Sequence, residues 1–91
     1  MDKLESPIRL LRKKLSMSQR RFALLVGKSS GHLSDLEDGT STLAPDIIAI
    51  LKEAGVDVET LAEEHTEFME LRRKQLMAEV KAKLEFDDDE G

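Results

Sequence analysis

The sequence contains no cysteine, no tryptophan and no tyrosine, and each absence excludes a class of site. Without cysteine, the chain forms no disulfide bond, thiolate metal site or cysteine nucleophile. Its two histidines, His32 and His65, are too few for a metal site unless carboxylates join them, so we expect no metal and no cofactor. Because the only aromatic residues are three phenylalanines, stacking on single-stranded nucleic acid is also disfavoured.

Long apolar runs are missing as well. No run approaches the roughly 20 residues of a membrane-spanning helix, and the N-terminus has no signal-peptide pattern. We therefore expect a cytoplasmic protein with no membrane partner. The abundant residues, which are Leu, Ala, Glu and Lys, are typical of an all-helical chain. A chain of 91 residues forms one small domain with a modest core. Domains of this size are often stabilised further by association with a second copy of the chain.

The net charge of −5 is unevenly distributed along the chain. Residues 1–30 contain eight Lys or Arg and two acidic residues, whereas residues 31–91 contain six basic and seventeen acidic residues. Screening by salt confines attraction to phosphate to a Debye length of roughly 8 Å. The basic N-terminal part therefore favours a nucleic-acid partner, and a merely solvated basic helix face is the alternative interpretation.

Apolar residues recur at helical spacing, and Ser, Asp and Gly mark the ends of the segments. We expect helices over residues 5–15, from Ser18 to Gly27, from Ser29 to Gly39, up to Gly55, and from Asp57 to Phe86. The predicted organisation is a domain over residues 1–61, an extended helix over 62–86, and an acidic disordered tail over 87–91.

The most specific pattern lies in residues 17–39, MSQRRFALLVGKSSGHLSDLEDG. Gln19 follows a capping serine, the small Ala23 stands where two helices must cross closely, and Gly27 comes four residues later. The same spacing continues through Ser29, Leu33, Glu37 and Gly39. This segment resembles the lambda-repressor-like helix-turn-helix family, also called the Cro/phage-repressor or XRE type. The resemblance covers about residues 8–61.

The resemblance implies an all-α, five-helix lambda-repressor-like domain with an extended C-terminal helix. In that family the second helix of the motif lies in the DNA major groove, and the preceding helix crosses the phosphate backbone. The positions implied at the DNA surface are Gln19, Arg20, Arg21, Lys28, Ser30, Gly31, His32, Ser34 and Asp35. Gln19 would face a phosphate, whereas Ser30, Gly31 and His32 would face the groove. For His32, a solvated surface position is the alternative.

The resemblance also implies that Glu37 forms a structural ion pair with Arg12 of the first helix. Asp35 is anomalous, because a carboxylate in the groove accepts only from donors such as cytosine N4. Lys28 stands where the family usually has an apolar residue, and the loop over residues 40–42 lacks the basic residues common there. We therefore expect weaker and more salt-sensitive DNA binding per monomer than a strongly basic relative would show.

The C-terminal helix is longer than a five-helix domain needs to close its core. Its apolar stripe is expected to mediate dimerisation and comprises Phe68, Met69, Leu76, Met77, Val80 and Leu84. The first half of the helix is acidic and the second half largely basic, so two copies match in charge when they are antiparallel. The alternative is a single helix that is stabilised by its own salt bridges.

These patterns predict a transcriptional regulator that binds double-stranded DNA, acting as a homodimeric repressor on a palindromic operator. Its two recognition helices would lie one DNA turn, roughly 34–36 Å, apart. The alternative is an antitoxin-like or accessory regulator whose acidic C-terminal half binds a protein partner, with DNA binding secondary. We do not expect an enzyme, because the sequence shows no nucleophile with a base, metal-ligand cluster or phosphate-binding loop.

Overall fold

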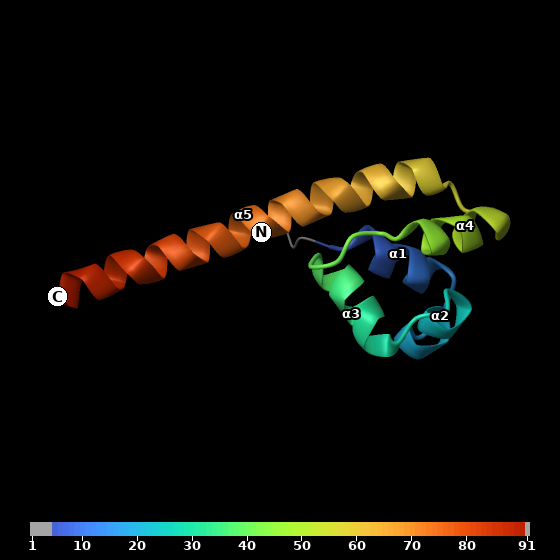
Figure 1. The fold of residues 1–91 in the computed structure, drawn as a ribbon, viewed down its shortest axis with the longest axis horizontal. Coiled ribbons are helices and arrows are strands. Elements are labelled where there is room, and N and C mark those ends of the chain that lie inside the picture. The colour runs from blue at the N-terminus through green and yellow to red at the C-terminus, as the bar shows by residue number, and fades with distance from the viewer. Residues whose placement is uncertain (1–4, 91) are drawn as a thin grey trace.

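The computed structural model describes residues 5–90, with side chains described for residues 5–85. In this range it contains five α-helices and no strand (Figure 1). The helices are α1 (Pro7–Lys14), α2 (Gln19–Leu25), α3 (Ser30–Asp38), α4 (Pro45–Glu53) and α5 (Val58–Glu90). The predicted all-α fold with a long C-terminal helix is confirmed.

Serine side chains begin the first three helices. The hydroxyl oxygen of Ser6 accepts hydrogen bonds from the backbone N–H groups of Ile8 and Arg9, at 3.2 and 3.3 Å. Ser18 and Ser29 cap α2 and α3, because each hydroxyl accepts from the backbone N–H three residues later. Such a cap stabilises a helix by about 1 kcal/mol, since it satisfies a donor that the helix itself leaves free.

Gly39 ends α3 and brings α5 close to it. Its φ angle is 83°, a left-handed conformation that side chains disfavour. A Cβ atom at this position would also lie 2.9 Å from Cε2 of Phe68 in α5. Glycine is therefore required here both for the backbone turn and for the close contact between α3 and α5.

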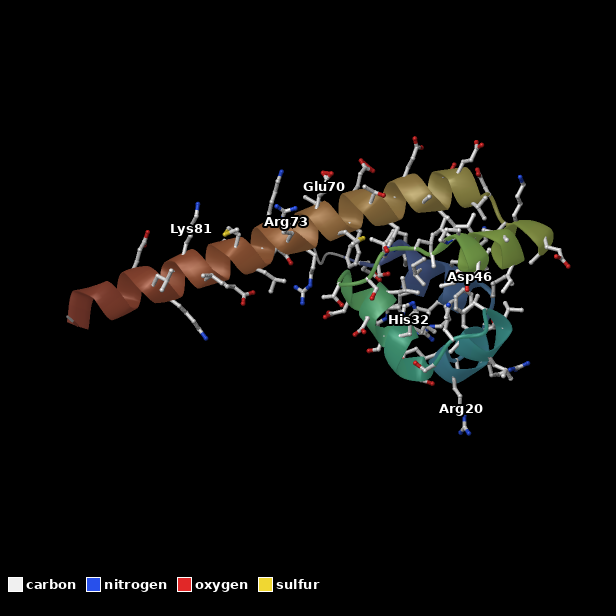
Figure 2. The ribbon with its side chains drawn as sticks, viewed as in Figure 1. Arg20, His32, Asp46, Glu70, Arg73 and Lys81 are labelled. Carbon is white, nitrogen blue, oxygen red and sulfur yellow. The ribbon has the colours of Figure 1, made fainter. Side chains whose placement is uncertain are left out.

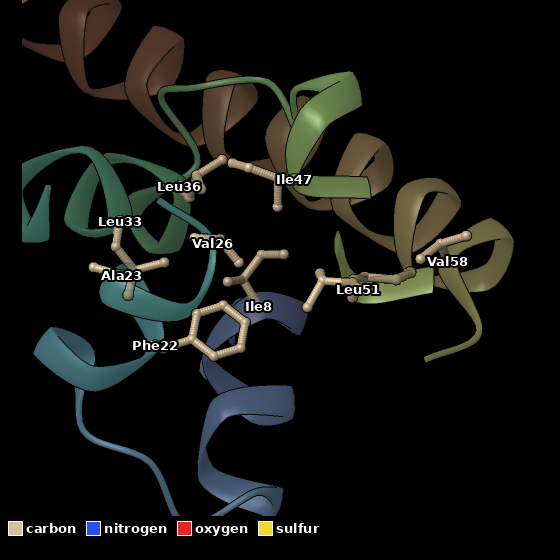
Figure 3. Packing of buried hydrophobic residues seen from close by; sticks show 10 residues of the cluster. Ile8, Phe22, Ala23, Val26, Leu33, Leu36, Ile47, Leu51 and Val58 are labelled. Atoms are coloured by element: carbon tan, nitrogen blue, oxygen red, sulfur yellow. The ribbon is translucent and has the colours of Figure 1, made fainter. Parts of the chain in front are cut away.

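The hydrophobic core is built from all five helices (Figure 3). Its buried members are Ile8, Phe22, Ala23, Val26, Leu33, Leu36, Ile47, Leu51, Val58 and Leu61. Ala23 lies where α2 meets α3, and its small side chain lets the two helices approach closely. Burial of these apolar side chains is the main source of stability, at roughly 25 cal/mol per Å² of apolar surface.

The first part of α5 packs on the domain, and the rest extends beyond the other helices (Figure 1). Its buried residues recur every three or four positions and are Val58, Leu61, His65 and Phe68. His65 Nε2 donates to the carbonyl oxygen of Ser41 at 2.9 Å, which ties the α3–α4 loop to α5. All side chains over residues 73–85 are exposed.

The backbone of α5 remains helical up to Glu90, beyond the expected end at Phe86. The reason is that no Gly or Pro occurs between Gly55 and Gly91 to end it. Residues 87–90, expected as a disordered tail, therefore have helical backbone. Gly91 and the side chains of the tail lie outside the described part of the chain.

Candidate nucleic-acid interface

The helices α2 and α3 are joined by a tight turn at Gly27, whose φ angle is 70°. The backbone N–H of Lys28 donates back to the carbonyl oxygen of Ala23 at 2.9 Å, which closes the turn. Ala23 and Leu33 are both buried, so the inner faces of the two helices are used for packing. This arrangement leaves the opposite face of α3 directed outward.

Four of the predicted groove-facing residues share that outer face. Ser30, Gly31, Ser34 and Asp35 occupy positions i, i+1, i+4 and i+5, which lie close together around a helix, and all four are exposed. A Cβ atom at Gly31 would meet only the hydroxyl oxygen of Ser29, at an ordinary 3.9 Å. No contact within the described protein therefore requires glycine at position 31.

His32 differs from these four residues. It is half-buried, and its Nε2 atom is buried without a hydrogen-bond partner among the described residues. Its backbone N–H is taken by the hydroxyl of Ser29, at 3.1 Å. One nitrogen of the ring is thus turned into the protein, so the free domain offers less of His32 to a groove than the sequence suggests.

Glu37 lies at the centre of a network that fixes α3 to α1 and α2. Arg12 donates from Nε to Glu37 Oε2 at 2.7 Å and from Nη2 to Glu37 Oε1 at 3.2 Å. The two side chains are only 14% and 8% exposed. The hydrogen bond to this carboxylate raises the pKa of Arg12 above its ordinary value. Gln19, expected at a phosphate, also donates from Nε2 to Glu37 Oε1, at 3.3 Å.

The other two carboxylates of α3 have different surroundings. Arg72 of α5 donates from Nε to the main-chain oxygen of Asp38 at 3.2 Å, and its Nη2 lies 3.4 Å from Asp38 Oδ1. Asp35 is exposed and forms no ion pair with any residue over 5–85. The acidic character of α3 is thus largely structural, and Asp35 is the one carboxylate of the helix left for an external partner.

The cations expected near DNA also divide into two groups. Lys28 Nζ forms an ion pair with Asp46 Oδ2 over 2.8 Å, and Asp46 lies in the first turn of α4. Arg20 and Arg21 are exposed and have no acidic partner in the described part of the chain. Figure 2 shows Arg20 pointing away from α2 into solvent. In the free protein, the two arginines are therefore available to phosphate and Lys28 is engaged.

The apolar stripe of α5 is exposed over most of its length. Its exposed members are Leu76, Met77, Val80 and Leu84, and Met69 is half-buried. Phe68 differs, because it is only 5% exposed and packs beside Gly39 within the domain, so it is not available to a partner. A groove of about 500 Å³ opens beside the stripe, between α5 and the α3–α4 loop.

Two residues of this region were missed by sequence reasoning, namely Asp46 and Arg72. Each pairs with a residue far away in the chain, so local spacing contained no sign of either contact. The only available signal was Lys28, a charged residue at a usually apolar position that needed a partner.

The part of the chain that the structure describes contains neither a metal site nor a membrane-spanning helix. Within it, no group of three or more His, Asp or Glu residues is arranged to hold a metal ion. None of its helices combines the length and the apolar character that crossing a membrane demands.

Comparison with known proteins agrees with this geometry. A model of the helix-turn-helix family matches residues 8–61, which is more than half of the chain and runs from α1 into α5. Searches of curated proteins and of solved structures gave no match. The matched family consists of DNA-binding transcription regulators and is not enzymatic. The chain therefore belongs to the helix-turn-helix family, of the XRE or lambda-repressor-like type, and is a DNA-binding transcription regulator.

Proposed function

We propose that the protein is a sequence-specific repressor that binds a palindromic operator as a homodimer. The observation that carries this proposal is the exposed outer face of α3, formed by Ser30, Gly31, Ser34 and Asp35. In proteins with this motif, the first residues of the second helix contact base edges in the major groove. The inner face of α3 is anchored by the core and by the ion pair of Arg12 with Glu37, so the outer face is rigidly presented.

The chemistry of this face suits base reading rather than simple attraction to phosphate. The hydroxyls of Ser30 and Ser34 both donate and accept hydrogen bonds, whereas Asp35 only accepts. Among the groove edges, cytosine N4 is the usual donor to a carboxylate, and the phosphate backbone repels the charge of Asp35. Asp35 would thus favour a cytosine at one position and disfavour most other bases there.

Phosphate contacts fall to the exposed side chains of Arg20 and Arg21. They lie on α2, the helix that crosses the DNA backbone in this family. Each phosphate neutralised contributes about 0.9 to the slope of log affinity against log salt concentration. With few free cations at the interface, a single chain would bind weakly, and a dimer would supply the remaining contacts.

The exposed stripe of α5 is the proposed dimer interface. It lies on the part of the helix that no other described element covers, and it is apolar where a solvated helix would be polar. The helix is acidic before this stretch, at Glu63, Glu67 and Glu70, and largely basic within it, at Arg73, Lys74, Lys81 and Lys83. Two such helices attract when antiparallel and repel when parallel.

A second candidate function uses the same surface differently. The exposed glutamates and the exposed stripe of α5 could together hold a basic protein partner, as in an antitoxin-like or accessory regulator. DNA binding would then be secondary. The two candidates differ in one measurable respect, because the first requires the chain to associate with itself.

Selection of bound sequences from a random duplex pool tests base recognition. The full chain should enrich a palindrome whose half-sites lie one DNA turn apart, roughly 10 base pairs centre to centre. Failure to enrich any sequence would count against a sequence-specific regulator. A single half-site without symmetry would count against the homodimer and favour the second candidate.

Sedimentation equilibrium tests the interface on α5. The wild type should be dimeric at tens of micromolar, and Leu76→Asp combined with Val80→Asp should be monomeric, because each aspartate places a charge in the apolar contact. Leu24→Asp is the matched control, since Leu24 is 81% exposed on α2, away from α5, and this variant should stay dimeric. A monomeric wild type or a dimeric double variant would show that the interface lies elsewhere.

A further inference from the structure

The ion pair between Lys28 and Asp46 joins two parts of the domain that are distant in sequence. Lys28 lies in the turn that precedes α3, and Asp46 lies in the first turn of α4. Nζ and Oδ2 are 2.8 Å apart, and the Lys28 side chain is the less exposed of the two. Figure 2 shows Asp46 between α4 and the part of the domain that holds α2 and α3.

The carboxylate is fixed by a second contact as well as by Lys28. Its Oδ1 accepts a hydrogen bond from the backbone N–H of Ile47 at 2.9 Å. The pKa of Asp46 is lowered, chiefly by the hydrogen bond from Lys28, so the group remains ionised at neutral pH. The positive charge of Lys28, next to the helix that we propose to read DNA, is therefore compensated by Asp46 within the protein.

Pairing with Asp46 keeps the charge of Lys28 from adding to the attraction for phosphate. Non-specific binding depends almost entirely on cations that contact phosphate, whereas specific binding also gains from base contacts. A lysine held by Asp46 therefore adds little to binding on any sequence, and attraction to phosphate is the contribution on which non-specific binding depends. The same pair leaves the outer face of α3 unchanged.

We propose that Asp46 is a positioning residue that holds Lys28 away from the DNA backbone and so limits non-specific binding by this regulator. The inference rests on the proposed DNA-binding function of the α2–α3 face. It assigns to Asp46 a role in setting how strongly the protein binds DNA of any sequence, without touching the DNA. Lys28 is then a structural residue, and it contacts phosphate only when Asp46 has lost its negative charge.

The test measures affinity for a mixed-sequence duplex of about 24 base pairs, long enough for two half-sites one helical turn apart, over a range of salt concentrations. Asp46→Asn retains the oxygen that accepts from Ile47 but removes the charge that holds Lys28. We expect tighter binding at low salt and a salt slope that steepens by about 0.9 per bound chain. Between 50 and 200 mM salt, this variant should lose about three- to fourfold more affinity per chain than the wild type.

Four further variants make the result specific to Lys28. Lys28→Met alone should leave the slope at the wild-type value, and combined with Asp46→Asn it should abolish the gain. Asp46→Glu keeps a carboxylate that can hold the lysine and should restore the wild-type slope. Glu53→Gln is the matched control, because it removes one exposed, unpaired carboxylate from the other end of α4 and should leave the slope unchanged.

The possible outcomes separate this inference from the proposed function. If Asp46→Asn leaves the slope unchanged, or if Lys28→Met alone lowers it by about 0.9, then Lys28 is not withheld and the inference is wrong. If the gain persists in the double variant, it arises from lost repulsion by Asp46 itself, which also overturns the inference. If the wild type shows no salt-dependent binding to any duplex, the proposed function fails and the inference fails with it.

Discussion

Arg72 of α5 caps the C-terminal end of α3 by donating from Nε to the main-chain oxygen of Asp38 at 3.2 Å. The last carbonyl groups of a helix carry partial negative charge, so a cation at this place is favourable. Gly39 makes the contact possible, because a Cβ atom there would lie 3.2 Å from Arg72 Cγ. The helix that we propose to bind a second copy is therefore attached directly to the helix that we propose to read DNA.

Arg72→Met should weaken this attachment while retaining most of the apolar stem. Because the Arg72 side chain is 32% exposed, we expect a loss of only about 0.5–1 kcal/mol in the free energy of unfolding, measured by urea denaturation. Arg73→Met is the control, since Arg73 is exposed and forms no ion pair in the described region. Equal free energies of unfolding for Arg72→Met and Arg73→Met would mean that the contact of Arg72 with the end of α3 does not stabilise the protein.

Breaking the pair of Arg12 with Glu37 should have a larger effect. Both side chains are nearly buried, so Glu37→Gln or Arg12→Met leaves an uncompensated charge at a cost of about 3 kcal/mol. The double variant should lose less than the sum of the two single losses, because it leaves no lone charge. Thermal melts and denaturant titrations of all three variants test this, and unchanged midpoints in the single variants would show that the pair contributes little.

The ends of α2 and α3 were predictable because short-range spacing determines them. Ser18, Ser29 and Gly39 act at the positions that their sequence neighbours indicate. The pair of Arg12 with Glu37 came only from the family resemblance, since 25 residues separate its members. The contacts of Asp46 and Arg72 depend on how α4 and α5 are placed in space, and no local pattern specifies that placement.

Two further positions show where pattern reading reaches its limit. Phe68 fits the helical spacing of the apolar stripe, but it packs within the domain, because Gly39 has no side chain and leaves room for its ring. His32 has the position of a groove-facing residue, yet one of its ring nitrogens is buried. In both cases periodicity gives the face of a helix, and packing decides which atoms on that face remain accessible.

Gly31→Ala should separate stability from DNA binding. Alanine favours a helix over glycine by about 1 kcal/mol, and the space around position 31 accommodates a methyl group, so the melting temperature should rise. Affinity for the selected operator should fall, because the methyl group would occupy the close approach between backbone and base. Ser34→Ala is the comparison variant, because Ser34 lies on the same face of α3 but this change adds no atoms between the backbone and a base. A rise in both stability and affinity would contradict a groove-facing Gly31.

Asp57 should contribute to stability in a pH-dependent way. Its pKa is lowered, chiefly by the hydroxyl of Thr60, which donates to Oδ2 at 2.8 Å, and also by the Thr60 backbone N–H. A carboxyl group with a lowered folded pKa stabilises the protein above its unfolded pKa of about 3.9 and loses this contribution as pH falls through the folded pKa.

Asp57→Asn keeps an acceptor for the cap but cannot titrate. The melting temperature of the wild type should therefore fall more steeply than that of this variant as pH decreases from about 5 to about 2. Parallel curves over this range would show that the hydrogen bonds from Thr60 do not distinguish the charged carboxylate from a neutral amide.

The central claim is that the outer face of α3 reads bases, and Asp35 tests it most directly because it is the only unpaired carboxylate of that helix among residues 5–85. The measurement is a parallel selection from a random duplex pool with the wild type and Asp35→Asn. We predict a palindrome for the wild type and, for the variant, a changed base preference at one symmetric position in each half-site. Identical sequences from both proteins, or no enriched sequence from the wild type, would contradict base reading by α3.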